Sequence, residues 1–213
     1  MDKKAKTLKV ILIGNSSVGK TCLIHHYDTG KFLDNIPPTV GSSFIKIKKK
    51  INEQNFILNF WDTAGQERHN SLTQTFAKNA QISILVYAIN DRESFEDLGK
   101  WLKIVKDNNG EKGYVLGVAG NKSDLYQEET VKENEGKKYA KKIGALFKVT
   151  SAKESCGIKE FVDELILKFM EIPQEEESPH KSSISSLDGQ DNVNDITGLN
   201  IKVDNDKKKN GCC

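Results

Sequence analysis

Residues 14–21 have the spacing of a phosphate-binding loop. They read Gly-Asn-Ser-Ser-Val-Gly-Lys-Thr, between the apolar run LKVILI and a helical pattern at 19–29. Glycine lets backbone N–H groups turn toward a phosphate chain, and the N-terminus of the following helix favours the same negative charge. Lys20 could reach the outer phosphates and Thr21 could bind magnesium through its hydroxyl. A plain glycine turn needs neither side chain, so the pattern predicts phosphate binding.

The segment Asn-Lys-Ser-Asp at 121–124 could identify the base. It follows the apolar run YVLGVAG, at the edge of the predicted sheet where open α/β folds bind ligands. Guanine offers two neighbouring donors, N1–H and the 2-amino group, and the Asp124 carboxylate has two acceptor oxygens to match them. Lys122 could lay its aliphatic stem along the base. Alone, such a tetrapeptide would more often be a simple turn.

Two other features favour guanine over that simple turn. The segment Thr-Ser-Ala-Lys at 150–153 also ends an apolar run, so it could place the backbone N–H of Ala152 at the guanine carbonyl. Phe32 lies seven residues before Thr39 and could stack on the exposed side of the base. With the phosphate loop upstream, these segments predict a guanine nucleotide.

The segment Trp-Asp-Thr-Ala-Gly-Gln-Glu-Arg at 61–68 carries groups for magnesium and for water. Asp62 ends an apolar run and is placed to hold magnesium through water, and Gly65 can offer an N–H to a terminal phosphate. The Gln66 amide both donates and accepts, which suits the orientation of an attacking water. The alternative is a surface loop in which Gln66 is merely solvated.

Buried strands and helices must position these segments. Continuous apolar runs at 8–14, 82–89, 114–120 and 145–150 alternate with helical patterns at 19–29, 92–108, 129–142 and 157–170. This alternation is typical of an α/β fold with a mostly parallel sheet covered by helices. Two segments, 42–51 and 55–61, flank a short polar connection and predict an antiparallel hairpin at one edge of the sheet.

Length and composition set the outer limits. The chain has 213 residues, 29% of them charged, and a net charge of +2. We expect one globular domain at 1–172 and a flexible tail at 173–213, where aromatics vanish and eight acidic residues face five lysines. No run is long enough for a membrane helix, and the lysine-bearing N-terminus has no apolar segment before a small-residue cleavage site, so we expect a cytosolic protein. The weak net charge argues against nucleic acid as a partner.

Together these motifs resemble a known family. GNSSVGKT, Thr39 within PPTVG, WDTAGQER, NKSD and TSAK are similar to the five nucleotide-binding segments of Ras-superfamily small GTPases. Within that superfamily, Phe44 after TVG, SLTQ at 71–74, LVY at 85–87 and the terminal Cys-Cys resemble the Rab branch.

The resemblance implies a P-loop NTPase fold with a six-stranded mixed sheet and about five helices. It also implies a GDP/GTP switch that hydrolyses GTP slowly, with Gln66 as the catalytic residue and Mg²⁺ held by Thr21, Thr39 and Asp62. The implied nucleotide contacts are Ser16, Ser17, Val18, Gly19, Lys20, Thr21, Cys22, Phe32, Thr39, Gly65, Asn121, Lys122, Asp124, Ser151, Ala152 and Lys153.

The resemblance further implies partners and a membrane. An exchange factor, an activating protein that supplies an arginine, escort and GDP-state extraction proteins, and effectors are expected. Phe44, Trp61 and Phe76 would form the effector surface, unless they serve only to pack the hairpin and a helix. Lipids on Cys212 and Cys213 would hold the protein at the cytoplasmic face of an intracellular membrane during vesicle transport.

Other classes stay open at this point. A nucleotide-dependent scaffold with negligible hydrolysis is one, although Gln66 argues against it. A P-loop nucleotide kinase is another, but its lid needs charge-clamping arginines and this chain contains only Arg68 and Arg92. A Ras- or Rho-like switch is less favoured, because the C-terminus lacks a cysteine followed by three further residues.

Overall fold

The computed structural model describes residues 5–33, 36–37, 39, 42–63, 70–110 and 113–173, without the side chains of residues 42, 43 and 70–72. Its strands form one six-stranded sheet in the order β2-β3-β1-β4-β5-β6. All neighbours are parallel except the β2–β3 hairpin, which pairs Ser42 with Thr63 and Ile51 with Gln54. The strands are β1 Lys6–Ile13, β2 Ser42–Ile51, β3 Gln54–Thr63, β4 Ile82–Ala88, β5 Val115–Asn121 and β6 Leu146–Val149. The predicted parallel sheet with one antiparallel edge hairpin is therefore confirmed.

Six α-helices lie among the described residues, where about five were expected. They are α1 Lys20–Thr29, α2 Asn70–Ala77, α3 Arg92–Glu96, α4 Leu98–Asn109, α5 Glu133–Lys142 and α6 Ile158–Met170. The extra helix arises because the segment expected to be one helix at 92–108 divides at Asp97 into α3 and α4. A short 3₁₀ segment, Ser123–Glu128, follows β5.

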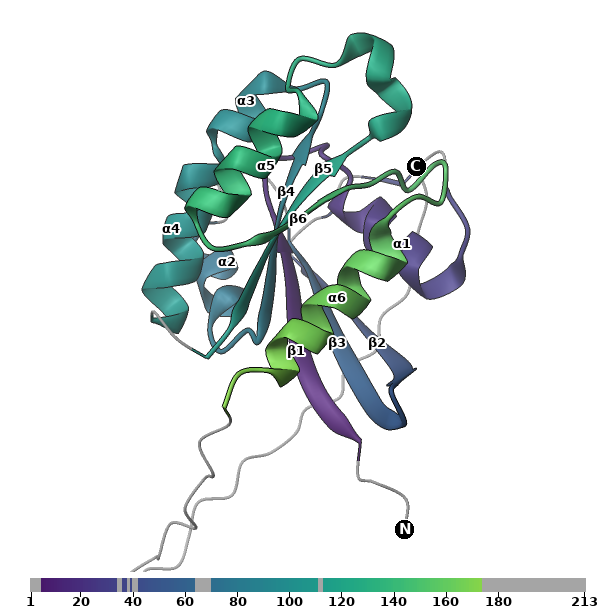
Figure 1. The fold of residues 1–213 in the computed structure, drawn as a ribbon, viewed down its shortest axis with the longest axis vertical. Helices are drawn as coiled ribbons and strands as arrows, with labels where there is room; N and C mark the ends of the chain where they lie inside the picture. Colours follow the sequence, from purple (N-terminus) through teal and green to yellow (C-terminus); the bar gives the residue numbers. More distant parts are fainter. Residues whose placement is uncertain are drawn as a thin grey trace, which may run out of the picture. The chain divides into compact units, whose positions relative to one another are not determined.

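The helices cover both faces of the sheet, so the central strands are buried on both sides. Figure 1 shows α1 and α6 on one face and α2 to α5 on the other. Every residue of β4 and β5 is buried, as their continuous apolar sequences predict. Each face has its own hydrophobic core, one beneath α1 and α6 and one beneath α4 and α5. The sheet therefore forms a buried central layer, and the ends of its strands can position the residues of a site.

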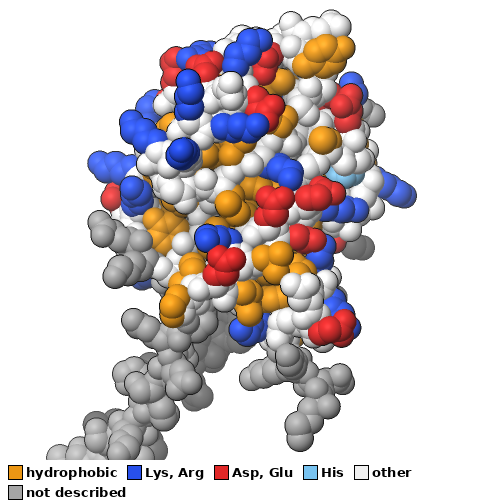
Figure 2. All heavy atoms as spheres, in the orientation of Figure 1, with side chains coloured by type: hydrophobic (Ala, Val, Ile, Leu, Met, Phe, Trp, Pro, Cys, Tyr) orange, Lys and Arg blue, Asp and Glu red, His pale blue; other side chains and the backbone are white. Residues whose placement is uncertain are grey.

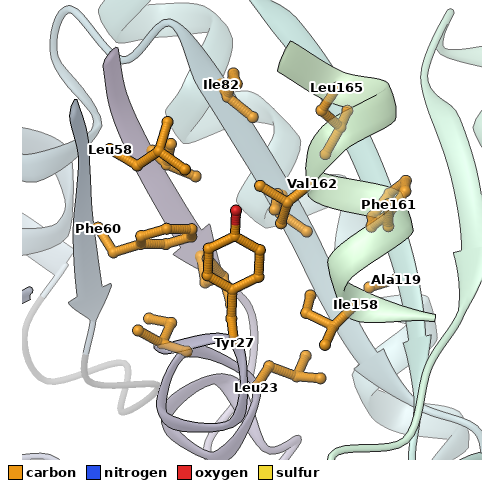
Figure 3. Close-up of a cluster of buried hydrophobic side chains, with 14 of the residues drawn as sticks. Leu23, Tyr27, Leu58, Phe60, Ile82, Ala119, Ile158, Phe161, Val162 and Leu165 are labelled. Atoms are coloured by element: carbon orange, nitrogen blue, oxygen red, sulfur yellow. The ribbon is translucent and has the colours of Figure 1, made fainter. Parts of the chain in front are cut away.

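An aromatic side chain from α1 fills the centre of the first core. Tyr27 is 6% exposed, and its ring centroid lies 5.2 Å from that of Phe60 on β3. Figure 3 shows the Tyr27 ring between Phe60 and α6, where Ile158 and Val162 close the other side. This packing fixes α1, and therefore the loop that precedes it, against the sheet.

Charged side chains on the visible surface are mixed in sign. In Figure 2, lysines and arginines alternate with acidic residues over the helices. Several are exposed ion pairs within one helical turn, such as Lys137 with Glu133 and Lys168 with Glu171, and such pairs contribute little to stability. Within the described part of the chain, no helix has both the length and the apolar character needed to cross a bilayer.

Candidate functional site

The loop between β1 and α1 has backbone positions that suit glycine. Gly19, the residue before α1, has φ 94°, in the left-handed region that glycine enters at no steric cost. A Cβ there would overlap the Asn121 side-chain amide, and a Cβ at Gly14 would overlap the carbonyl oxygen of Val86 on β4. The close approach of β4 and β5 therefore requires both glycines of the motif.

Lys20, the first residue of α1, is folded back over this loop. Its side chain is 5% exposed, and its Nζ donates to the carbonyl oxygens of Gly14 at 2.9 Å and Asn15 at 2.7 Å. Burial lowers the pKa of Lys20 to about 8, although the charge of Asp62 opposes this shift. A buried ammonium of this kind is stabilised by an anion such as a phosphate chain.

Three oxygen-bearing side chains meet beside Lys20. Thr21 Oγ1 donates to Asp62 Oδ2 at 2.7 Å, and Thr39 Oγ1 lies 3.1 Å from the same oxygen and 2.8 Å from Thr21 Oγ1. Asp62 is 1% exposed, and burial raises its pKa while the two hydroxyls and Lys20 lower it. Among the described residues, Asp62 Oδ1 has no hydrogen-bond partner. The set is all oxygen and includes a carboxylate, so its donors fit a hard divalent cation.

A cavity of about 290 Å³ opens in front of these groups. Its floor is the phosphate loop and the start of α1, and its wall comes from the segment that contains Thr39. The lining residues are Ser16, Ser17, Gly19, Lys20, Thr21, Cys22, Ile36, Pro37, Thr39, Thr63 and Lys122.

A second cavity, of about 320 Å³, adjoins the first, because Gly19, Cys22 and Lys122 line both. It lies where β5 and β6 end, and its other lining residues are Phe32, Asn121, Asp124, Leu125, Ala152 and Lys153. Sequence segments more than 100 residues apart thus form one continuous groove with an anion-binding end and an end lined by Asp124 and Phe32.

Hydrogen bonds of two predicted contact residues hold the groove together. Asn121 is 2% exposed; its Nδ2 donates to the Val18 carbonyl oxygen at 2.8 Å and its Oδ1 accepts from Thr150 Oγ1 at 3.1 Å. Ser151 is fully buried, and its Oγ donates to Asp124 Oδ1 at 2.6 Å. Asn121 therefore ties the phosphate loop to the base end, and Ser151 orients the Asp124 carboxylate.

Comparison with known proteins decides the family. Residues 9–171 match the model of the Ras family. A Rab-5A of Dictyostelium discoideum is 34% identical over 212 residues, which cover 100% of this chain and 98% of the relative. A Rab-21 of Geodia cydonium is 38% identical over 163 residues, covering 76% and 71%, and human Rab-21 is 37% identical over 174 residues, covering 82% and 77%.

The chain belongs to the Rab family of small GTPases. Such a protein binds guanine nucleotide, hydrolyses GTP and acts as a switch in intracellular trafficking. The groove across the ends of β1, β3, β5 and β6 is where the fold places the residues expected to do this. The predicted fold and family are confirmed.

The three aromatic residues of the expected effector surface form one cluster on this Rab-family chain. Ring centroids lie 5.2 Å apart for Phe44 and Trp61, edge to face, and 5.1 Å apart for Trp61 and Phe76, stacked. Lys9 Nζ lies 5.2 Å from the centroid of the Trp61 ring. Phe44 is 48% exposed, so the cluster reaches the surface.

Some expected residues fall outside the described part of the chain, and some site residues were missed. Gly65, Gln66, Cys212 and Cys213 lie outside the described residues, so their roles stay predictions. Missed lining residues are Ile36, Pro37, Thr63 and Leu125. Pro37 and Thr63 lie inside quoted motifs, and Ile36 and Leu125 adjoin one, so their position in the sequence was the available signal. Asn15, whose carbonyl receives Lys20, was also missed although it lies inside the phosphate loop.

Proposed function

We propose that this Rab-family protein binds GTP with Mg²⁺ along the groove. The phosphates lie in the cavity of about 290 Å³ above the loop at 14–21, and guanine lies in the adjoining cavity between Phe32, Lys122 and Asp124. Lys20 then pairs with the outer phosphates, and Asp124 accepts hydrogen bonds from guanine N1–H and the 2-amino group.

The observation that carries this proposal is the oxygen cluster of Thr21, Thr39 and Asp62 beside the Lys20 ammonium. We assign Thr21 and Thr39 as ligands of Mg²⁺ and Asp62 as the group that holds it through water. When bound, Mg²⁺ neutralises charge that develops on the outer phosphates. Thr21 belongs to α1 and Asp62 to β3, so both donors stand on rigid elements, whereas Thr39 joins them from the segment between α1 and β2.

Hydrolysis in this proposal depends on Gln66 and on an arginine from a partner. Gln66 orients the attacking water. Arg92 is already engaged: its Nη1 lies 2.8 Å from Glu135 Oε2, its Nε lies 3.3 Å from Glu96 Oε1, and its guanidinium lies over the Phe95 ring. Those contacts hold α3 to α5, so Arg92 is unsuited to serve as an arginine finger, and slow intrinsic hydrolysis with strong activation in trans is expected.

Switching would follow from contacts with the terminal phosphate. Thr39 and Gly65 belong to two different segments that flank the β2–β3 hairpin, and each would contact the γ-phosphate. Loss of that phosphate removes a contact that both segments share. Effectors and exchange factors would read the change beside the cluster of Phe44, Trp61 and Phe76.

Membrane attachment is proposed at the C-terminus. Lipids on both Cys212 and Cys213 would give stable anchoring at the cytoplasmic face of an intracellular membrane, since a single chain anchors only marginally. Escort and GDP-state extraction proteins would handle the lipids. The region at 173–213 would serve as a linker between this anchor and the nucleotide-binding domain at 1–172. Replacement of both cysteines by serine should leave GTP binding intact, and membrane fractionation should then find the protein in the cytosol.

A single-turnover assay tests the core of the proposal. Protein loaded with GTP should hydrolyse it slowly when Mg²⁺ is present and should retain it poorly when EDTA is added. Asp62→Asn tests the assigned metal-binding group, and it should lose the response to Mg²⁺ while Thr63→Ser, a change in the same cavity lining, keeps it. Hydrolysis that is independent of Mg²⁺ would contradict the assignment.

A further inference from the structure

The side chain of Asn15, in the phosphate loop, is held by helix α4. Trp101 Nε1 donates to Asn15 Oδ1 at 2.7 Å, and Asn15 Nδ2 donates to Asp97 Oδ2 at 2.9 Å. Trp101 is 4% exposed and Asp97 is 9% exposed, so both contacts are partly shielded from water. These three residues, 15, 97 and 101, are called the Asn15 clamp below.

The chemistry of the clamp matches an amide at position 15. An indole N–H can only donate, and an ionised carboxylate can only accept, so the residue between them needs one acceptor and one donor. Hydrogen bonds from Lys100 and then from Asn15 lower the pKa of Asp97, which keeps its carboxylate ionised. Lys100 Nζ lies 2.6 Å from Asp97 Oδ1, so both carboxylate oxygens are engaged. The two partners therefore allow only one orientation of the Asn15 amide, with Oδ1 toward Trp101 and Nδ2 toward Asp97.

The clamp is connected to the nucleotide site through the backbone of Asn15. The Asn15 carbonyl oxygen accepts from Lys20 Nζ at 2.7 Å, the shorter of the two hydrogen bonds that hold this ammonium. Lys20 is 5% exposed, so the direction of that carbonyl decides where the ammonium stands. Asp97 stands at the break between α3 and α4, and from this position its carboxylate contacts Asn15 in the phosphate loop.

We propose that Trp101 and Asp97 are positioning residues for the phosphate site: they hold the Asn15 side chain, fix the carbonyl that receives Lys20, and so control how long the nucleotide is retained. This inference rests on the proposed role of Lys20 at the outer phosphates. Neither Trp101 nor Asp97 lines the phosphate cavity or the base cavity. Their effect therefore passes through Asn15 and Lys20.

The experiment measures release of a fluorescent GDP from the full chain in excess Mg²⁺. Trp101→Phe keeps an aromatic ring and removes the N–H donor, and we expect release about tenfold faster, the effect of one lost buried hydrogen bond. Asn15→Ala breaks the same contact from the other side. If both act through one clamp, the double variant should release GDP little faster than the faster single variant, because the shared contact is lost only once.

A matched control separates positioning from general weakening of the fold. Val105→Ala removes buried volume from the same helix and the same hydrophobic core without touching Asn15. Its melting temperature should fall, whereas its GDP release should stay near the wild-type rate. A release rate in Trp101→Phe no faster than in Val105→Ala, or effects of Asn15→Ala and Trp101→Phe that multiply, would overturn the proposal.

An exchange of partners provides a rescue. Asn15→Asp places two carboxylates within hydrogen-bond range and should accelerate GDP release, whereas Asn15→Asp combined with Asp97→Asn restores one donor and one acceptor and should slow it again. No rescue would contradict the clamp. Lys20→Ala distinguishes the proposed phosphate site from the Asn15 clamp. Unchanged GDP release in this variant would refute the assignment of Lys20 to the phosphates. Fast release in Lys20→Ala with normal release in Trp101→Phe would refute only the clamp.

Discussion

The phosphate half and the base half of the groove are built differently. In the base half, Asp124 is held by Ser151, and Asn121 is held between Val18 and Thr150. In the phosphate half, a buried ammonium rests on backbone carbonyls, and two hydroxyls converge on one oxygen of a buried carboxylate. In the base half, hydrogen bonds within the chain hold the side chains in place, whereas the phosphate half has charges that a bound nucleotide and cation would neutralise.

This difference assigns the two halves of the groove different roles in nucleotide binding and hydrolysis. Asp124 and Ser151 closely follow β5 and β6, so the side chain proposed to recognise guanine is anchored on the strand ends. Thr39 and Gln66 belong to segments that join other elements, and in the proposed function both act at the phosphates. Substitutions in the base half should alter which nucleotide binds, and substitutions in the phosphate half should alter how fast it is released or hydrolysed.

The largest effect is expected at Gln66, whose proposed role is at the phosphates. Gln66→Leu removes the amide that orients water, so stimulation by an activating protein, about 10³ to 10⁵-fold for such enzymes, should be almost entirely lost. Affinity for GTP should not change. Single-turnover hydrolysis with and without the activating protein measures both quantities, and full activation of the variant would contradict the role of Gln66.

A large effect of another kind is expected at Asp124, in the base half. Asp124→Asn replaces an acceptor with a donor opposite the guanine amino group, so GTP affinity should fall about 10³-fold, the loss of two charge-assisted hydrogen bonds. Xanthosine triphosphate, which has a carbonyl at that position, should bind better than it does to the wild type. Competition binding with both nucleotides tests this, and an unchanged preference for GTP would remove Asp124 from the site.

An intermediate effect is expected at Thr21. Thr21→Ala deletes a proposed ligand of Mg²⁺ and should accelerate GDP release about 100-fold, in the range seen when a metal site loses a supporting group. EDTA should accelerate release from the wild type strongly and from this variant only slightly, because the variant has already lost most of its bound cation. Equal responses to EDTA would show that Thr21 is not a ligand. Selectivity for guanine over xanthine should stay unchanged, because Thr21 lines the phosphate cavity and not the base cavity.

The smallest effect is expected at Ser151, behind the base cavity. Ser151→Ala removes the hydrogen bond to Asp124 Oδ1 and should weaken GDP and GTP binding about five- to tenfold. Ser155→Ala changes an exposed serine of the same loop and should have no such effect. Equilibrium titration with a fluorescent nucleotide resolves a change of this size, and equal affinities of the two variants would contradict the support role of Ser151.

The sequence by itself determined the kind of fold and the family, and it predicted the segments of the site. Apolar runs and their spacing predicted the strands because strands buried on both faces need continuous hydrophobic residues. Gly19, Lys20 and Thr21 were recognisable because phosphate binding depends on local backbone shape and a fixed order of side chains. Asp124 and Lys122 were recognisable for a similar reason, since each follows the end of a predicted strand.

Only the tertiary structure decided how those segments support one another. Asn121 and Val18 are 103 residues apart, and Trp101 and Asn15 are 86 residues apart, yet each pair shares a hydrogen bond. Local propensity carries no information on such contacts, because they depend on which strand ends and which helix meet at the edge of the sheet. The break at Asp97, which the sequence did not predict, is slight, because its φ of −74° and ψ of −8° lie near helical values. The contacts of this side chain with Asn15 and Lys100 give the position its role.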